Sequence, residues 1–255
     1  EDRALINRLG FNNDGLNSCI EKLQVRKSHG VLGINLGKNK DTPLEHAGAD
    51  YLKGLSATHA WADYFCINIS SPNTEDLRQL QEGNQLSRLL DQLCRQREML
   101  DHEAGKKTPL LIKLAPDWKE EALQQSIERI KTFPLDGVIA TNTTLSREGL
   151  TSPLARESGG LSGKPLLKYS TRVIKILYRE IGAKIPIIGV GGIFTAEDAY
   201  AKIKAGASAV QVYTGLIYQG PGLVKEIKKG LVRLLRQDGL PNISAAIGLD
   251  EKTEV

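Results

Sequence analysis

The chain has 255 residues, 40% of them hydrophobic, which is enough to bury the core of one large domain or two small ones. Its formal net charge of +4 arises from 34 basic and 30 acidic residues, and so mild an excess predicts no nucleic-acid partner. The three cysteines are an odd number without metal-ligand spacing, which favours a reducing compartment and predicts no metal site. No apolar run approaches the roughly 18 residues of a membrane span, and no signal peptide is visible.

Short apolar runs rich in Val and Ile recur along the chain, and each ends in a polar residue or a glycine. Such nearly continuous hydrophobicity is typical of parallel strands that are covered on both faces. In chain order the predicted strands are VLGINL (31–36), YFCINI (64–69), PLLIKL (109–114), GVIATN (137–142), IPIIGV (185–190) and AVQVYT (209–214).

Amphipathic stretches between these runs place apolar residues three and four apart, which predicts helices over 86–100, 120–133, 166–181 and 196–206. Thr195 is the expected N-cap of the last of these helices, and Gly206 is its expected C-cap. A basic stretch at 225–237 predicts a solvated helix face, with contact to anionic membrane lipid as the alternative.

Alternating strands and helices predict an α/β fold with a parallel sheet. Six βα units fit either an open doubly wound sheet or strands 3–8 of a (β/α)₈ TIM barrel. Polar residues at the carboxyl ends of the strands favour the barrel, in which these ends converge on one mouth. The long Gly- and Ser-rich segment 146–165 lacks helical periodicity, so we expect it to be a lid or a binding loop.

Three features of the strand ends suggest a chemistry. The adjacent glycines of IIGVGGI (187–193), followed by VQVYTG (210–215), indicate a phosphate site after the last two strands, with a pair of tight turns as the alternative. Lys113 would need an anionic partner in a barrel mouth, and a flavin ring suits it, with a surface lysine that reaches solvent as the alternative. The amides of Asn35, Asn68, Asn73 and Asn142 suit a flat substrate with alternating carbonyls and N–H groups, such as a pyrimidine.

The expected catalytic base is unusual. No histidine or acidic dyad stands at any strand end, so a serine in a dry site is the candidate base.

Eight ordered blocks of the sequence closely resemble class 2 dihydroorotate dehydrogenases, the membrane-associated, quinone-using type, and their bacterial members more than the mitochondrial ones. The blocks are INRLGFNN (6–13), GINLGKNK (33–40), NISSPNT (68–74), IKLAPD (112–117), ATNTT (140–144), GGLSGKPL (159–166), IIGVGGI (187–193) and VYTGLIYQGP (212–221). The resemblance implies an FMN-binding (β/α)₈ barrel domain over 1–255 that oxidises (S)-dihydroorotate to orotate in de novo pyrimidine biosynthesis and passes electrons to a quinone.

The resemblance also implies residue roles. Ser71 matches the base that removes a proton from substrate C5, where class 1 members carry cysteine, and Thr74 and Phe11 match the positions that shape the proton exit. The matched substrate set is Asn7, Arg8, Leu9, Gly10, Phe11, Asn68, Asn73, Asn142 and Thr143. The matched FMN set is Asn35, Asn68, Lys113, Thr141, Ser162, Gly163, Gly191, Gly192, Tyr213 and Thr214.

The resemblance further implies that two barrel strands and a small helical domain precede Glu1, and that this domain associates peripherally with the cytoplasmic face of a bacterial inner membrane. The mitochondrial inner membrane is the alternative. Two other functions stay open: a class 1-like or other dihydropyrimidine flavin oxidoreductase with a different acceptor, and a non-catalytic flavin-binding fragment.

Overall fold

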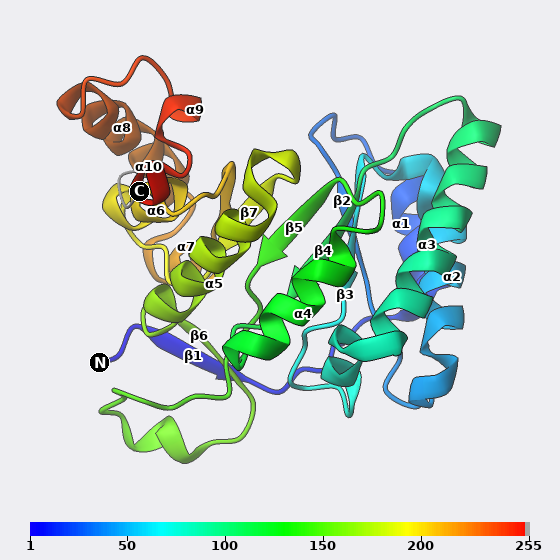
Figure 1. Cartoon of the computed structure of the whole chain (residues 1–255). Helices are drawn as coiled ribbons and strands as arrows, with labels where there is room; N and C mark the ends of the chain where they lie inside the picture. Colours follow the sequence, from blue (N-terminus) through cyan, green and yellow to red (C-terminus); the bar gives the residue numbers. More distant parts are fainter. Residues whose placement is uncertain (253–255) are drawn as a thin grey trace.

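The computed structural model describes residues 1–252 and contains one six-stranded parallel sheet in the order β2-β3-β4-β5-β7-β8 (Figure 1). Each of the six predicted runs contains one of these strands, so the predicted parallel sheet is confirmed. The bounds are β2 Gly33–Leu36, β3 Tyr64–Asn68, β4 Leu110–Leu114, β5 Gly137–Ala140, β7 Ile187–Val190 and β8 Ala209–Gln211.

Helices follow the strands and pack on the convex face of the sheet (Figure 1). The four predicted helices are all present. The helices are α1 Gly15–Gln24, α2 Ala47–Thr58, α3 Gly83–Ala104, α4 Glu120–Ile130, α5 Leu166–Ile181, α6 Ala196–Lys204, α7 Thr214–Gln219, α8 Gly222–Gln237, α9 Ile243–Ala246 and α10 Leu249–Lys252. Within residues 1–252, five 3₁₀ turns lie between strands and helices: η1 Leu44–His46, η2 His59–Trp61, η3 Leu77–Gln81, η4 Pro153–Arg156 and η5 Gly182–Lys184.

Helix α6 shows how local chemistry sets the helix ends. The Thr195 hydroxyl accepts a hydrogen bond from the Asp198 N–H at 3.2 Å, and the Asp198 carboxylate returns one to the Thr195 N–H at 3.1 Å. This reciprocal pair is a capping box, which satisfies two backbone donors that the first helical turn leaves free. At the other end the C-cap is Ala205. Gly206, the predicted C-cap, is the next residue and has φ +121°, so the prediction was wrong by one residue.

The sheet separates two apolar layers because alternate strand residues point to opposite faces. On the convex face, Phe65, Ile67 and Ile112 join the large core formed with the helices. On the concave face, Cys66 and Leu111 belong to a small cluster that also contains Ile139 and Val190. Fully burying one such aliphatic or aromatic side chain contributes about 1.5–3 kcal/mol to folding.

A second, two-stranded sheet lies across the carboxyl ends of the parallel strands (Figure 1). It pairs β1 (Ala4–Asn7) antiparallel with β6 (Gly160–Gly163). The expectation of an irregular segment over 146–165 is therefore wrong for β6. Glycine is needed here because a Cβ at Gly160 would lie 2.1 Å from the Thr143 hydroxyl oxygen. The ribbon formed by β1 and β6 thereby packs directly on the loop after β5.

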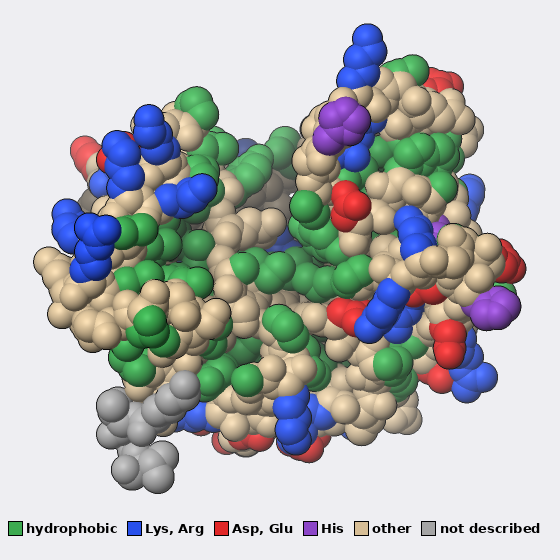
Figure 2. All heavy atoms as spheres, turned by 90° about the horizontal axis from the view of Figure 1, so that it is seen from above, with side chains coloured by type: hydrophobic (Ala, Val, Ile, Leu, Met, Phe, Trp, Pro, Cys, Tyr) green, Lys and Arg blue, Asp and Glu red, His purple; other side chains and the backbone are tan. Residues whose placement is uncertain are grey.

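Seen from above, the molecule is hollowed between the part that holds the C-terminal helices, on the left, and the part that holds α1 to α3, on the right (Figure 2). Hydrophobic side chains line this hollow, and Lys and Arg side chains gather on the outer left, over the C-terminal helices. Within residues 1–252, β2 and β8 each pair with a single neighbour, so they are the two edges of a curved sheet.

Candidate active site

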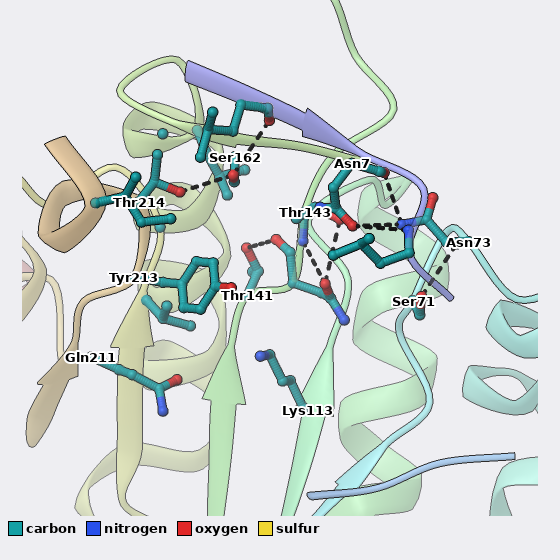
Figure 3. Close-up of a pocket in the computed structure, with 18 of the residues that line it drawn as sticks. Asn7, Ser71, Asn73, Lys113, Thr141, Thr143, Ser162, Gln211, Tyr213 and Thr214 are labelled. Atoms are coloured by element: carbon teal, nitrogen blue, oxygen red, sulfur yellow. Dashed lines mark hydrogen bonds between the residues drawn. The ribbon is translucent and has the colours of Figure 1, made fainter. Parts of the chain in front are cut away.

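A cavity of about 670 Å³ opens at the carboxyl ends of the parallel strands, beneath the β1–β6 ribbon (Figure 3). It is within the size range of small-molecule and cofactor sites. All but two of the predicted site residues line it: Asn7, Leu9, Gly10, Phe11, Asn35, Asn68, Ser71, Asn73, Lys113, Thr141, Asn142, Thr143, Ser162, Gly163, Gly191, Gly192, Tyr213 and Thr214.

The two exceptions are Arg8 and Thr74. The Arg8 side chain is largely exposed, and its guanidinium lies 3.0 Å from the Glu157 carboxylate, on the outer side of the ribbon. Thr74 is 5% exposed but does not reach the cavity wall. Arg8 therefore tethers the ribbon to the segment before β6, whereas its neighbours Asn7 and Leu9 contact the cavity.

Sequence reasoning missed part of the lining. Gln211 is the last residue of β8, two residues before Tyr213, and both side chains line the cavity. Leu5 and Ile6 of β1 also line the cavity, but their contribution depends on pairing with β6, which lies more than 150 residues away. Further lining residues that were missed are Asn12, Leu166, Val190, Ile193, Val212, Gly215 and Ile217.

Two asparagines and a serine form a fixed polar cluster on one wall. The Asn142 side-chain NH₂ donates to the Asn68 amide oxygen at 3.1 Å and to the Ser70 hydroxyl at 3.0 Å. The Ser70 hydroxyl donates to the same Asn68 oxygen at 3.0 Å, and the Thr143 N–H donates to the Asn142 amide oxygen at 2.7 Å. Because each amide is held by a neighbour, the orientations of its donor and acceptor are set before any ligand binds.

Asn73 connects the loop after β3 to the ribbon. Its side-chain NH₂ donates to the Asn7 carbonyl at 2.9 Å and to the Asn7 amide oxygen at 3.1 Å (Figure 3). Its backbone N–H donates to the Ser71 hydroxyl oxygen at 3.2 Å. The Asn73 residue thus joins the predicted base to the strand that covers the cavity.

Ser71 lies in a dry position at the edge of this wall. It is 7% exposed, and the only hydrogen bond to its hydroxyl oxygen from residues 1–252 comes from the Asn73 N–H. No histidine, carboxylate or lysine in that range bonds to it, so Ser71 is not part of a triad of the hydrolase type. Proton transfer from a hydroxyl in such a site requires a relay to solvent.

Lys113 projects from β4 into the floor of the cavity (Figure 3). Burial lowers the pKa of its ammonium group, and no residue of the described chain gives it a hydrogen bond or an ion pair. The nearby Cys66 thiol does not balance the charge, because burial raises its pKa to about 11 and keeps it neutral. A partly buried ammonium without a partner is costly, so this position favours an anionic or electron-rich ligand.

The far end of the cavity is built from glycines and hydroxyls. Gly191 and Gly192 have φ values of +115° and +76°, and neither backbone N–H donates to another residue of the described chain. The Thr214 hydroxyl donates to the Ser162 hydroxyl at 2.8 Å on the facing wall. Free N–H groups beside hydroxyls are the donors that protein sites use to bind a phosphate.

A curved parallel sheet with helices on its convex face and a polar cavity at the carboxyl ends of its strands defines an enzyme of the (β/α)₈-barrel class. Residues 1–235 match the family model described as dihydroorotate dehydrogenase. The chain belongs to this family.

Relatives and solved structures agree with this membership. The protein named dihydroorotate dehydrogenase (quinone) from Trichodesmium erythraeum is 47% identical, over 99% of this chain and 68% of its own length. The protein of the same name from Idiomarina loihiensis is 53% identical, over 89% of this chain and 68% of its own length. The structure of the Eimeria tenella enzyme in complex with ferulenol superposes with a TM-score of 0.92 at 39% identity, covering 98% of this chain and 72% of that one.

Proposed function

We propose that this protein oxidises (S)-dihydroorotate to orotate in de novo pyrimidine biosynthesis, with a quinone as the final electron acceptor. The observation that carries the proposal is the pairing, in one cavity, of the unpartnered Lys113 ammonium with the Asn68–Ser70–Asn142 polar cluster, in a chain of this family. A flat, amide-rich substrate above an electron-accepting ring would use both features.

FMN is the cofactor that we propose for the cavity. The unpaired Lys113 ammonium suits the pyrimidine end of the ring, and the free N–H groups of Gly191 and Gly192, with Tyr213 and Thr214, suit the phosphate. The remaining wall residues of the proposed flavin set are Asn35, Asn68, Thr141, Ser162 and Gly163. Bound FMN would supply the acceptor for the hydride that leaves substrate C6.

Ser71 is the proposed base that takes the proton from substrate C5. Its burial excludes bulk water, and the Asn73 N–H at 3.2 Å orients the hydroxyl oxygen that would accept the C5 proton while its own proton leaves through a relay. Two further residues are proposed to shape the route by which the proton leaves. They are Thr74, which is buried, and Phe11, which lines the cavity.

The substrate amides and carboxylate would meet Asn7, Asn68, Asn73, Asn142 and Thr143, which converge from β1 and from the loops after β3 and β5. Leu9 and Gly10 line the cover of this site. Arg8 points out to Glu157, so we propose that it holds the cover in place and does not touch the substrate.

We further propose that residues 1–255 form an FMN-binding (β/α)₈ barrel domain in which β2, β3, β4, β5, β7 and β8 are barrel strands 3–8. Strands 1 and 2 of such a barrel would pair with the free edges of β2 and β8. Within residues 1–252, no helix combines the length and the apolar character needed to cross a membrane. The proposed location is peripheral, at the cytoplasmic face of a bacterial inner membrane.

The test is anaerobic mixing of the flavin-loaded protein with dihydroorotate. Loss of the visible flavin absorbance, followed by its return on addition of a ubiquinone analogue and not of fumarate or NAD, is the expected result. Absence of bleaching would refute the proposed oxidation. Return of absorbance with fumarate or NAD would refute a quinone as the final electron acceptor and favour the class 1-like alternative.

A further inference from the structure

Arg78 lies outside the cavity but contacts the backbone on both sides of it. It sits on η3, directly after the loop that carries Ser71, and its side chain points back toward that loop. Its Nε donates to the Ser70 carbonyl at 3.1 Å, and its Nη2 donates to the Thr143 carbonyl at 2.9 Å. Ser70 is adjacent to the proposed base, and Thr143 is itself in the proposed substrate set.

Asp117 extends this connection to a third loop. Its carboxylate accepts a hydrogen bond from Arg78 Nη1 at 2.7 Å. The same carboxylate accepts the Leu145 N–H at 3.0 Å and the Thr144 hydroxyl proton. Asp117 follows β4, so the Arg78–Asp117 pair joins the loops after β3, β4 and β5.

The geometry suits a positioning role better than a general contribution to stability. A guanidinium is a planar fork with donors in fixed directions, so three simultaneous bonds fix the relative positions of the three acceptors. The two side chains are 21% and 25% exposed, which leaves their interaction less screened than that of a surface pair. The polar cluster of Asn68, Ser70 and Asn142 orients side chains, whereas Arg78 holds the backbone carbonyls beside them.

We propose that Arg78, held by Asp117, is a positioning residue for proton abstraction, which sets the distance between the Ser71 hydroxyl and the substrate held by Asn142 and Thr143. This inference rests on the proposed function. It assigns to Arg78 no contact with substrate or cofactor. A misplacement of about 1 Å at a reacting centre can reduce a rate on the order of 100-fold.

The experiment compares Arg78→Met, Arg78→Lys and Asp117→Asn with the wild type, all loaded with flavin. Arg78→Met keeps most of the side-chain stem and removes every donor, and Arg78→Lys keeps the charge but cannot reach three acceptors. Arg172→Met is the matched control, because Arg172 forms an ion pair of the same 2.7 Å length with Glu120, where both side chains are more than half exposed. Stopped-flow absorbance follows flavin reduction by dihydroorotate and by its C5-deuterated form, and then reoxidation by a quinone.

We expect flavin reduction to slow roughly 10- to 100-fold in Arg78→Met and Arg78→Lys, and the C5 deuterium isotope effect to rise. We expect Asp117→Asn to slow reduction in the same direction, and Arg172→Met to match the wild type. Flavin content and reoxidation by quinone should stay unchanged in all variants, because neither uses the base. A general loss of folding would lower flavin content and both half-reactions together.

Reduction by Arg78→Met within twofold of the wild type, or an unchanged isotope effect, overturns the inference while leaving the proposed function intact. If Arg78→Met does not fold, the same criteria applied to Asp117→Asn decide. A wild-type protein whose flavin is not reduced by dihydroorotate overturns the proposed function and this inference with it.

Discussion

Lys113 on β4 and Asn68 on β3 are register partners in the parallel sheet, so their side chains leave the same concave face side by side. One is a partly buried ammonium without a partner in the described chain, and the other is an amide fixed by Ser70 and Asn142. This arrangement places a positive charge under a surface that is already organised for hydrogen bonding.

Lys113→Met removes the charge and roughly conserves volume. We expect weaker flavin binding, a lower flavin reduction potential and slower reduction by substrate, because a cation stabilises the reduced, anionic ring more than the oxidised ring. A differential effect of about 1.4 kcal/mol corresponds to about 30 mV for a two-electron couple. A redox titration against wild type measures it, and an unchanged midpoint potential with an unchanged rate would show that Lys113 does not contact the flavin.

Ser71→Ala removes the proposed base without opening the site. We expect full flavin content and a loss of flavin reduction by dihydroorotate of about 10²–10⁴-fold, the typical contribution of a general base. Ser71→Cys should be partly active at best, because the surroundings present a hydrogen-bond donor suited to a hydroxyl oxygen. Anaerobic stopped-flow reduction measures both, and near-normal reduction in Ser71→Ala would assign the base elsewhere.

Gly192→Val tests the phosphate end of the cavity. At Gly192 φ is +76°, and an added Cβ would lie 2.5 Å from the Leu167 backbone nitrogen, so the turn must shift. We expect the variant to purify without bound flavin. Gly239→Val is the matched control, because Gly239 has φ +66° and nothing within 4 Å of an added Cβ. Full flavin occupancy in Gly192→Val would place the phosphate at another position.

The burial of Lys202 predicts that the free energy of unfolding depends on pH. Lys202 is fully buried between α5 and α6, where Nζ donates to the Ser170 hydroxyl at 2.5 Å, and burial lowers its pKa to about 7. Between pH 7 and about pH 10.4, the pKa of a lysine in the unfolded chain, the unfolded chain holds a proton on Lys202 that the native protein lacks. The free energy of unfolding should therefore rise with pH in this window, by up to about 1.4 kcal/mol per pH unit.

Urea denaturation between about pH 6 and pH 9 measures this dependence. Lys202→Met should flatten the rise, and Lys228→Met, at an exposed position on α8, should retain the wild-type slope. Equal slopes in the wild type and in Lys202→Met would mean that Lys202 keeps its proton in the folded protein.

The local sequence pattern was sufficient to predict most of the parallel sheet, four of the helices and the polar ends of the strands. The six strands and four of the helices follow from apolar runs and from 3.6-residue periodicity, and Thr195 caps α6 through atoms within three residues of itself. The polar strand ends, Asn68 and Lys113 among them, were expected to converge, because in a barrel the carboxyl ends of parallel strands meet at one mouth. These features depend on neighbours along the chain or on the general geometry of the fold class.

Only the tertiary structure decided the β1–β6 ribbon and the directions of the Arg8 and Arg78 side chains. β1 and β6 have no strand signature of their own, and they form because residues about 150 positions apart pair, with Gly160 allowing close approach to Thr143. Arg8 turns outward to Glu157, and Arg78 reaches the carbonyls of two loops and a carboxylate in a third. The direction of a long side chain depends on which acceptors the folded chain brings within reach, and no periodicity along the sequence encodes those acceptors.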